Sequence, residues 1–477
     1  MAFHPSRCRT RPADWAGHRD PQHRMESPMI DIDGFRSTLT GRAYAPGDDG
    51  YDDVRQPWNL NIDQSPAVVV AAENAGDVQA AVRLARDNDL PFSVLSSGHG
   101  LPRGNDGVVV NVSRFAGVDV DAARQVARID AGARWRAVLE AAAPDSLAGL
   151  SGTAPTVGAV GYTLGGGIGL LLRRYGFAAD SIVAADVVTA DGSLVRAAAD
   201  ENPDLLWALK GGGGNFGVVT SLEVRLYEVP TVHNGMMIYP GARAGEVLRA
   251  WAEWTSGVSD DVTSAVMVMT FPPLPAVPEP LRGQHVAMVR ATVADGDASA
   301  VDALRDTLGA PLVDRFGPQT YLEAALSGNE PTDPMPTAGR STAFTELSDA
   351  AIDGLIELVA PGSPVPGVDI RHLGGAAAKD EDSPLSHRDT RFVAAANALA
   401  ATPEQRAAVQ DRLDSGFAAL APHSGPVGVF NFLAPGSSPE VVEAAFAPAA
   451  YQRLRDVKRT WDPQNVFQYT HNIPPAV

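Results

Sequence analysis

The chain has 477 residues, a formal net charge of −19 and 45% hydrophobic residues. This length is enough for two or three domains, and the excess of negative charge argues against a nucleic-acid partner or an anionic membrane. The single cysteine excludes a disulfide within the chain and a cysteine-based metal site, and no apolar run reaches the length of a membrane-spanning helix.

Residues 1–29 are rich in Pro, Arg, His and Asp and contain no apolar core. This composition predicts a disordered leader rather than a secretory signal, so we expect a cytoplasmic protein. The leader histidines (His4, His18 and His23) could bind metal, but a solvated tail is the simpler interpretation, and we predict no metal site.

From about Ile30 the pattern becomes that of a folded domain, which we expect to end near residue 230. Apolar runs predict strands at 67–72, 90–95 and 107–112, and helical spacing predicts helices at 75–88 and 135–143. Alternating residues at 117–121 and 125–131 predict a hairpin. Strands that alternate with helices indicate an α+β or α/β domain.

The composition changes after residue 230. Strand-like runs at 265–270 and 286–293 alternate with helical patterns at 298–308 and 348–359, and proline-rich stretches separate them. We therefore expect a second domain over 231–428, an antiparallel sheet with helices on it. A helix is predicted over 439–458 within a closing segment, 429–477.

The first domain contains three glycine-rich segments. The earliest of them follows the strand at 90–95. Its residues, Ser-Ser-Gly-His-Gly at 96–100, have backbone N–H groups that can cradle a phosphate or pyrophosphate. The others lie at 152–169 and 210–217. A nicotinamide Rossmann site has its glycines in the first strand-to-helix turn of the domain. The glycines at 165–169 follow more than a hundred residues of that domain and no strand leads into them, which argues against such a site. Lys210 precedes its glycines, which excludes a P-loop.

Hydrolase and zinc-protease signatures are absent. The Leu-Ser-Ser-Gly-His run lacks the first glycine of Gly-x-Ser-x-Gly, and no His-Glu-x-x-His run exists.

Several motifs occur in a fixed order. They are Ser-Ser-Gly-His at 96–99, Pro-Thr-Val-Gly at 155–158, Leu-Gly-Gly-Gly-Ile-Gly at 164–169, Arg-Arg-Tyr-Gly-Phe-Ala-Ala-Asp at 173–180, Gly-Gly-Gly-Gly-Asn-Phe-Gly at 211–217 and Trp-Asp-Pro-Gln-Asn-Val-Phe at 461–467. Together they closely resemble the berberine-bridge-enzyme-like family of FAD-linked oxidases, within the vanillyl-alcohol-oxidase or p-cresol-methylhydroxylase (PCMH) superfamily. The resemblance covers roughly residues 30–230 and 367–477, and is nearest to singly linked bacterial members such as antibiotic-pathway oxidases.

The resemblance implies an α+β, two-domain fold. Residues 30–230 would form a PCMH-type FAD-binding domain, and 231–428 a substrate domain of antiparallel sheet covered by helices. Residues 429–477 would return to the FAD-binding domain.

The resemblance also implies covalent FAD. His99 matches the histidine that bonds to the flavin, and Ser96, Ser97, Gly98 and Gly100 would hold the pyrophosphate. Leu95 stands where the family loop usually begins with Arg.

A second link in many members comes from a cysteine that is here Ala154, so FAD would be attached through His99 only. Val157 occupies the position that gates oxygen, and its small side chain favours an oxidase. Further cofactor contacts are implied for Gly158, Gly161, Gly217, Val219, Tyr469 and Asn472. Tyr469 and Asn472 could equally be packing residues.

The catalytic base is the main departure from the family pattern. Many relatives carry Tyr-x-Asn-Tyr/Phe, but here Val429 replaces the tyrosine while Asn431 and Phe432 match. The enzyme therefore finds its base elsewhere or needs none. Candidates that could instead be structural are Tyr162, His372, His387 and Tyr321.

The expected activity is removal of a hydride from a C–H next to N or O of a small secondary metabolite. The flavin would be reoxidised by O2 to give H2O2. Alternatives are a flavin-dependent monooxygenase or oxidative cyclase of a polyketide-like substrate, and a non-catalytic flavin-binding protein. The expected partners are a small-molecule substrate and O2, with no nucleic acid or membrane, in a monomer or homodimer.

Overall fold

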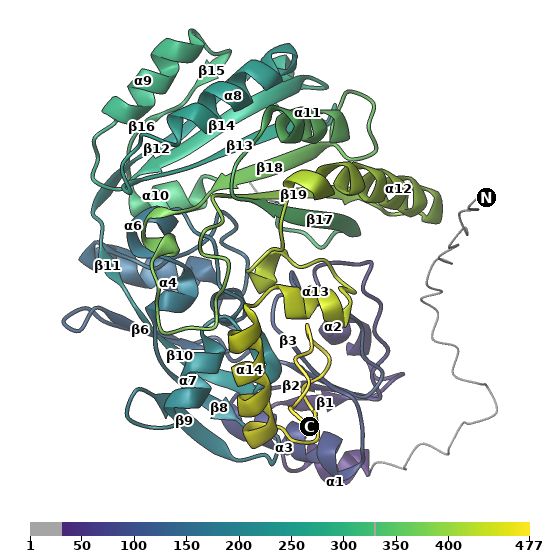
Figure 1. The fold of residues 1–477 in the computed structure, drawn as a ribbon. Coiled ribbons are helices and arrows are strands. Elements are labelled where there is room, and N and C mark those ends of the chain that lie inside the picture. Colours follow the sequence, from purple (N-terminus) through teal and green to yellow (C-terminus); the bar gives the residue numbers. More distant parts are fainter. Residues whose placement is uncertain (1–30, 329–330) are drawn as a thin grey trace, which may run out of the picture.

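The computed structural model describes residues 31–328 and 331–477, so the predicted leader with its histidines lies outside the described residues. The chain folds into a lower half, which holds two larger sheets and a two-stranded pair, and an upper half built on one large sheet (Figure 1). Within the described residues, no helix is both long enough and apolar enough to cross a membrane.

A four-stranded sheet opens the lower half. Its order is β1 (Arg42–Tyr44), β2 (Val68–Ala71), β4 (Val108–Asn111) and β3 (Phe92–Leu95). β2, β4 and β3 are parallel, and β2 and β4 are buried along their whole length, which explains their continuous runs of valine. The glycine–histidine loop at 96–100 therefore leaves from the carboxyl edge of a parallel strand.

The second sheet of the lower half is antiparallel. Its order is β5 (Val118–Asp121), β6 (Val126–Asp130), β10 (Val218–Arg225), β8 (Ile182–Val188) and β9 (Leu194–Ala198). β5 and β6 form the predicted hairpin. A separate two-stranded pair joins β7 (Leu147–Ala148) to β11 (Tyr227–Glu228).

Short helices surround these sheets. They are α1 (Ile32–Arg36), α2 (Tyr51–Arg55), α3 (Ala75–Asp87), α4 (Trp135–Ala142), α5 (Ala159–Leu164), α6 (Leu172–Tyr175) and α7 (Pro203–Leu209). α3 begins where the Asn74 side chain accepts a hydrogen bond from the N–H of Asp77. Its apolar face, with Val78 and Val82, covers the four-stranded sheet.

The upper half contains an eight-stranded antiparallel sheet. Its strands are β12 (Thr231–Pro240), β13 (Val262–Thr270), β14 (His285–Val293), β15 (Val313–Asp314), β16 (Gly317–Thr320), β17 (Thr337–Phe344), β18 (Gly367–His372) and β19 (Phe392–Leu399). The order is β15-β12-β14-β13-β18-β19-β17, with β16 beside β12.

One face of this sheet is covered by helices (Figure 1). They are α8 (Ala244–Trp254), α9 (Ser299–Leu308), α11 (Asp349–Leu358) and α12 (Pro403–Leu420), and their apolar residues form one core with the sheet around Trp251. α10 (Tyr321–Leu326) lies at the junction with the lower half. The uncovered face meets the lower half. Helices combine with a partly parallel and an antiparallel sheet in the lower half and with an antiparallel sheet in the upper half, which confirms the α+β prediction.

The closing segment differs from the prediction in one respect. The single helix expected over 439–458 is wrong, because the chain forms α13 (Pro439–Ala444) and α14 (Pro448–Trp461). Pro448 has no N–H to donate and biases Ala447 toward extended backbone, where φ is −63° and ψ is 145°. The helix therefore breaks and restarts at this proline.

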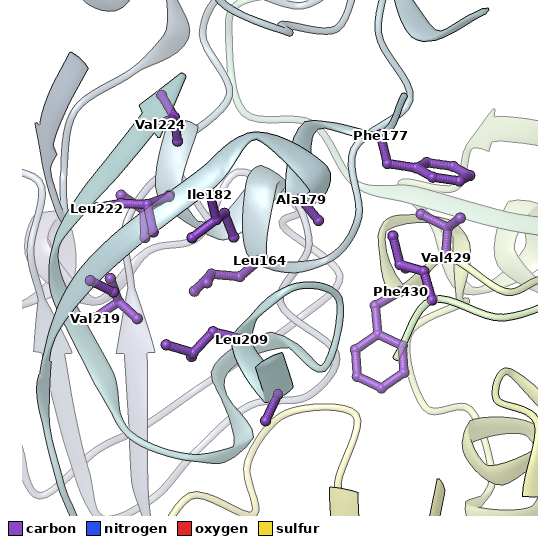
Figure 2. Packing of buried hydrophobic residues seen from close by; sticks show 14 of the residues in the cluster. Leu164, Phe177, Ala179, Ile182, Leu209, Val219, Leu222, Val224, Val429 and Phe430 are labelled. Atoms are coloured by element: carbon purple, nitrogen blue, oxygen red, sulfur yellow. The ribbon is translucent and has the colours of Figure 1, made fainter. Parts of the chain in front are cut away.

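The closing segment also joins the lower core. Val429 and Phe430 belong to the same buried cluster as Phe177 and Leu164, and Figure 2 shows Val429 beside Phe177.

Candidate active site

A cavity of about 610 Å³ lies between the two halves. Its wall combines the loop at 96–100, glycines of the other two glycine-rich segments, the closing segment, and the uncovered face of the large sheet. Segments far apart in the sequence therefore meet at one site.

His99 lines this cavity on the loop that follows β3. Its imidazole stacks on the indole of Trp58, with ring centroids 4.3 Å apart and an interplanar angle of 18°. Burial, assisted by the charge of Arg134, lowers the pKa of His99 to about 4. The ring is therefore neutral at pH 7, and its Nε2 is buried without a hydrogen bond from the described residues.

The loop around His99 presents backbone to the cavity. In the part of the chain that the structure describes, no N–H group of residues 97–100 donates to a protein acceptor. Gly98 has a φ of +75°, and a Cβ there would lie 2.6 Å from the Cα of Pro57. Gly100 faces open space. Such a loop can hold an anion through its N–H groups.

The second glycine-rich segment closes against this loop. The N–H of Gly158 donates to Ser97 Oγ at 3.2 Å, and the carbonyl of Val157 accepts from the N–H of Trp135 at 3.1 Å. A Cβ on Gly161 would meet no atom within 4 Å, so a ligand can approach this backbone closely. Ala154 and Val157 both line the cavity.

The predicted cofactor residues gather at this cavity, with one exception. The lining includes Ser96, Ser97, Gly98, His99, Gly100, Val157, Gly158, Gly161, Gly217, Val219 and Tyr469. Asn472 lies outside the lining, and its Oδ1 is buried without a donor from the described residues.

Tyr162 is the predicted catalytic candidate that reaches the cavity. Its ring meets Trp135 edge to face at 5.7 Å. Its hydroxyl is buried without a hydrogen-bond partner among the described residues, and burial holds the pKa of Tyr162 well above its ordinary value. The group is therefore a hydrogen-bond donor rather than a base at neutral pH.

The other three candidates lie elsewhere. His372 is buried on β18 within 3.0 Å of Arg173 Nη1, and burial lowers its pKa to about 3. His387 Nε2 lies 2.9 Å from the carbonyl oxygen of Ala444. Tyr321 donates to the carbonyl of Gly149 at 2.7 Å. None of the three is among the residues lining the cavity, so each has a structural environment instead.

The large sheet brings residues that the sequence reasoning missed. Asp369 and Arg371 of β18 line the cavity, whereas Ile370 between them is buried in the helix-covered core. The signal was the two-residue period of a strand, which puts Asp369 and Arg371 on the face opposite to His372.

Asp369 is held by two guanidinium groups. Arg371 Nε donates to its Oδ2 at 2.8 Å, and Arg290 donates to its Oδ1. Burial alone would raise the pKa of Asp369, but these two cations hold it below its ordinary value. The carboxylate is therefore charged and already paired.

His471 of the closing segment also lines the cavity and was missed. Its ring meets Phe430 at 5.5 Å, and burial lowers its pKa to about 4. Among the described residues, no cluster of three His, Cys, Asp or Glu side chains is arranged to hold a metal ion.

These features fit a flavin nucleotide. The open Cβ positions of Gly100, Gly161 and Gly214 leave room for a ligand against the backbone, and the N–H groups of the loop suit a pyrophosphate. His99 lines the same cavity with a neutral ring whose Nε2 has no partner among the described residues.

Comparisons with known families agree with this geometry. Residues 66–198 match the FAD binding domain family, and residues 430–474 match the berberine and berberine-like family. (R)-6-hydroxynicotine oxidase of Paenarthrobacter nicotinovorans is 30% identical over 466 residues, which cover 92% of this chain and 97% of that protein. An FAD-dependent monooxygenase of Penicillium roqueforti is 34% identical over 217 residues, 44% of this chain and 42% of its own.

Solved structures share the whole fold. A crystal structure of 6-hydroxy-D-nicotine oxidase from Arthrobacter nicotinovorans superposes with a TM-score of 0.80 at 27% identity, covering 92% of this chain and 98% of its own. Chitooligosaccharide oxidase, at 21% identity, has a TM-score of 0.79 and covers 94% of this chain and 100% of its own. The fold is therefore that of the PCMH-type oxidases.

Proposed function

Because this chain is an FAD-dependent oxidoreductase of the berberine-bridge-enzyme-like family, we propose that it is an oxidase of a small secondary metabolite. It removes a hydride from a C–H bond next to nitrogen or oxygen and uses O2 as the electron acceptor. FAD, when bound, accepts the hydride and passes two electrons to dioxygen, which leaves as H2O2.

His99 is the residue that carries this proposal. It lines the cavity as a neutral ring with an unpartnered nitrogen, which suits a nucleophile that attaches the cofactor. Ala154 stands at the other linking position, so His99 is the only attachment point in the proposal. Backbone N–H groups of residues 97–100 hold the pyrophosphate.

Val157 supports an oxidase rather than a dehydrogenase. Its small side chain lines the same cavity as His99 and leaves space for dioxygen in the proposal.

The charge states of the cavity residues limit which class of substrate the enzyme can oxidise. Asp369 is paired with two arginines, and His471 has a pKa of about 4, so each is a weak proton acceptor at pH 7. Tyr162 retains its proton. A substrate that loses hydride from a neutral amine needs no strong base, and its nitrogen can accept a hydrogen bond from the Tyr162 hydroxyl. We therefore favour an amine, with an alcohol as the other option.

Measurement of H2O2 release across a panel of secondary amines and alcohols tests this function. The proposal expects turnover of at least one amine, with a rate that rises with pH as the amine loses its proton. It expects the Tyr162→Phe variant to keep its flavin and lose about tenfold in kcat/KM, the effect of one hydrogen bond. A flavin-loaded enzyme that reduces on a substrate but yields no H2O2 in air would contradict an oxidase.

A monooxygenase or oxidative cyclase is the second candidate. The similarity to a fungal FAD-dependent monooxygenase and the replacement of the family tyrosine by Val429 favour it. Turnover in labelled O2 separates the two, because label in the product indicates oxygenation, whereas label only in H2O2 indicates an oxidase.

A further inference from the structure

The His99 ring is positioned by an aromatic contact, in contrast to three other histidines of this fold. His372, His285 and His387 each have a ring nitrogen within hydrogen-bond distance of a protein group. For His99 no hydrogen bond of the ring to a described residue occurs, and its contact is the stack on Trp58. A histidine that reacts at one nitrogen is commonly oriented by a hydrogen bond at the other. For His99, the face of the Trp58 indole takes the place of this orienting hydrogen bond.

Trp58 is itself held on two sides. Its backbone N–H donates to the carbonyl of Ser97 at 3.2 Å, which ties the main chain to the loop of His99. Its carbonyl accepts from the N–H of Met335 at 2.9 Å, next to β17 of the large sheet. The neighbouring Asn59 accepts from the N–H of Thr337 at 3.1 Å. The backbone that carries the indole is therefore anchored to both halves of the molecule, whereas the indole N–H has no partner among the described residues.

The loop at 96–100 packs closely against the backbone of the segment that carries Trp58. A Cβ on Gly98 would lie 2.6 Å from the backbone nitrogen of Trp58, and Gly98 adopts a φ of +75°. Any larger residue at this position would separate the two segments. Glycine here allows the indole to reach the imidazole of the next residue.

We propose that Trp58 is a positioning residue that holds the His99 imidazole in the orientation needed for covalent attachment of FAD. The inference rests on the proposed role of His99. In the attachment, a bond forms between a ring nitrogen of His99 and the 8α carbon of the flavin, and one C–H bond of that methyl group breaks. The methyl carbon and the imidazole each lose a proton, and the two electrons released reduce dioxygen to H2O2. Attachment then depends on the stack, whereas non-covalent binding of FAD does not.

The rate of covalent attachment tests the proposal directly. Full-length apoprotein is mixed with FAD in air, samples are precipitated with acid over time, and the flavin that stays with the protein is measured. Trp58→Leu removes the planar face but keeps an apolar side chain, and Trp58→Phe keeps a planar face. Trp254→Leu is the matched control, because Trp254 is a partly buried tryptophan on α8 away from the cavity.

The expected result is a rate lowered about 10- to 100-fold in Trp58→Leu, the cost of a misplaced reacting group. Trp58→Phe and Trp254→Leu stay within about threefold of the parent protein, and the dissociation constant of non-covalent FAD changes little in all variants. Attachment at the parent rate in Trp58→Leu would overturn the inference. So would loss of non-covalent FAD binding in that variant, because Trp58 would then build the site rather than orient His99.

The His99→Ala protein separates this inference from the proposed function. Covalent flavin in His99→Ala would contradict the linkage itself. A His99-dependent linkage with normal kinetics in Trp58→Leu would contradict only the role of Trp58.

Discussion

The side chain of Asn431 accepts a hydrogen bond from the backbone N–H of Gly167 at 2.7 Å, across 264 positions of the chain. Its Nδ2 also donates to the carbonyl of Tyr162 at 3.1 Å. One amide therefore fixes two positions of the glycine-rich segment, one of them the backbone of Tyr162, which lines the cavity. The closing segment contributes to the site through this contact as well as through the residues that line it.

Replacement of Asn431 by alanine should loosen this junction. Two backbone groups lose their partners at a partly exposed site, so we expect the free energy of unfolding to fall by about 0.5–1.5 kcal/mol. Thermal denaturation measures the effect. Asn397→Ala, at an exposed asparagine that lines the same cavity, is the control and should change stability by less than about 0.5 kcal/mol. An Asn431→Ala protein as stable as its parent would show that the junction does not depend on this amide.

Lys458 and Asp462 form a fully buried ion pair at the end of α14. Lys458 Nζ donates to Asp462 Oδ2 at 2.7 Å and to the carbonyl of Asn215 at 2.7 Å, and burial lowers the pKa of the lysine. Lys458→Met leaves the buried carboxylate of Asp462 without its cation, although two backbone N–H groups still donate to it, so we expect a loss of about 3 kcal/mol in the free energy of unfolding.

Denaturant titration measures this loss, and the adjacent Arg459 provides the control. Arg459 pairs with Asp456 at 3.1 Å on the surface, so Arg459→Met should cost less than about 1 kcal/mol. Equal effects of the two substitutions would contradict the structural role given to the buried pair.

A substitution at Val157 tests whether O2 is the electron acceptor. Val157→Ile adds one methylene at the cavity wall, and we expect reoxidation of the reduced enzyme by O2 to slow at least about tenfold, a barrier of about 1.4 kcal/mol. Stopped-flow absorbance follows the reaction, and the rate of reduction by substrate should stay unchanged. Val160→Ile adds the same methylene elsewhere on the wall and is the control. Unaltered reoxidation in Val157→Ile would remove this residue from the path of O2.

His372 should make stability depend on pH. Burial lowers its pKa from 6.5 to about 3 in the folded chain, so between these values the unfolded chain binds a proton that the folded chain does not. Stability is therefore complete above about pH 6.5 and falls as the pH is lowered, by up to roughly 1.4 kcal/mol per pH unit from this group.

Denaturant titrations at pH 7, 6, 5 and 4 measure this dependence. His372→Gln, which keeps an acceptor for Arg173, should show a shallower fall in the acid range than the parent protein. His423→Gln, at an exposed histidine, should keep the parent slope. An unchanged slope in His372→Gln would show that this histidine does not carry the acid sensitivity.

Local patterns predicted the loop at 96–100 and the strand before it, and both are present in the structure. The strand before residues 96–100 and the small residues within that loop are consecutive in the chain, so their arrangement follows from local backbone preference. The resemblance then added Val157, Gly158 and Gly161, which line the same cavity.

The cavity wall formed by the large sheet was harder to predict, because it depends on which face of a distant sheet is covered. On β18 the histidine at 372 drew attention, yet Val368 and Ile370 share its face and pack against the helices. The alternation places Asp369 and Arg371 toward the cavity. Trp58 carried no pattern at all, since its role arises from a loop packed between both halves.

The location of the flavin tests the central claim most directly. Acid-precipitated protein is digested, and the peptides are examined by mass spectrometry for a covalent flavin adduct. The account predicts one adduct, on the peptide that contains His99, and colourless precipitate from the His99→Ala protein. An adduct on any other residue, or covalent flavin that persists in His99→Ala, would contradict it.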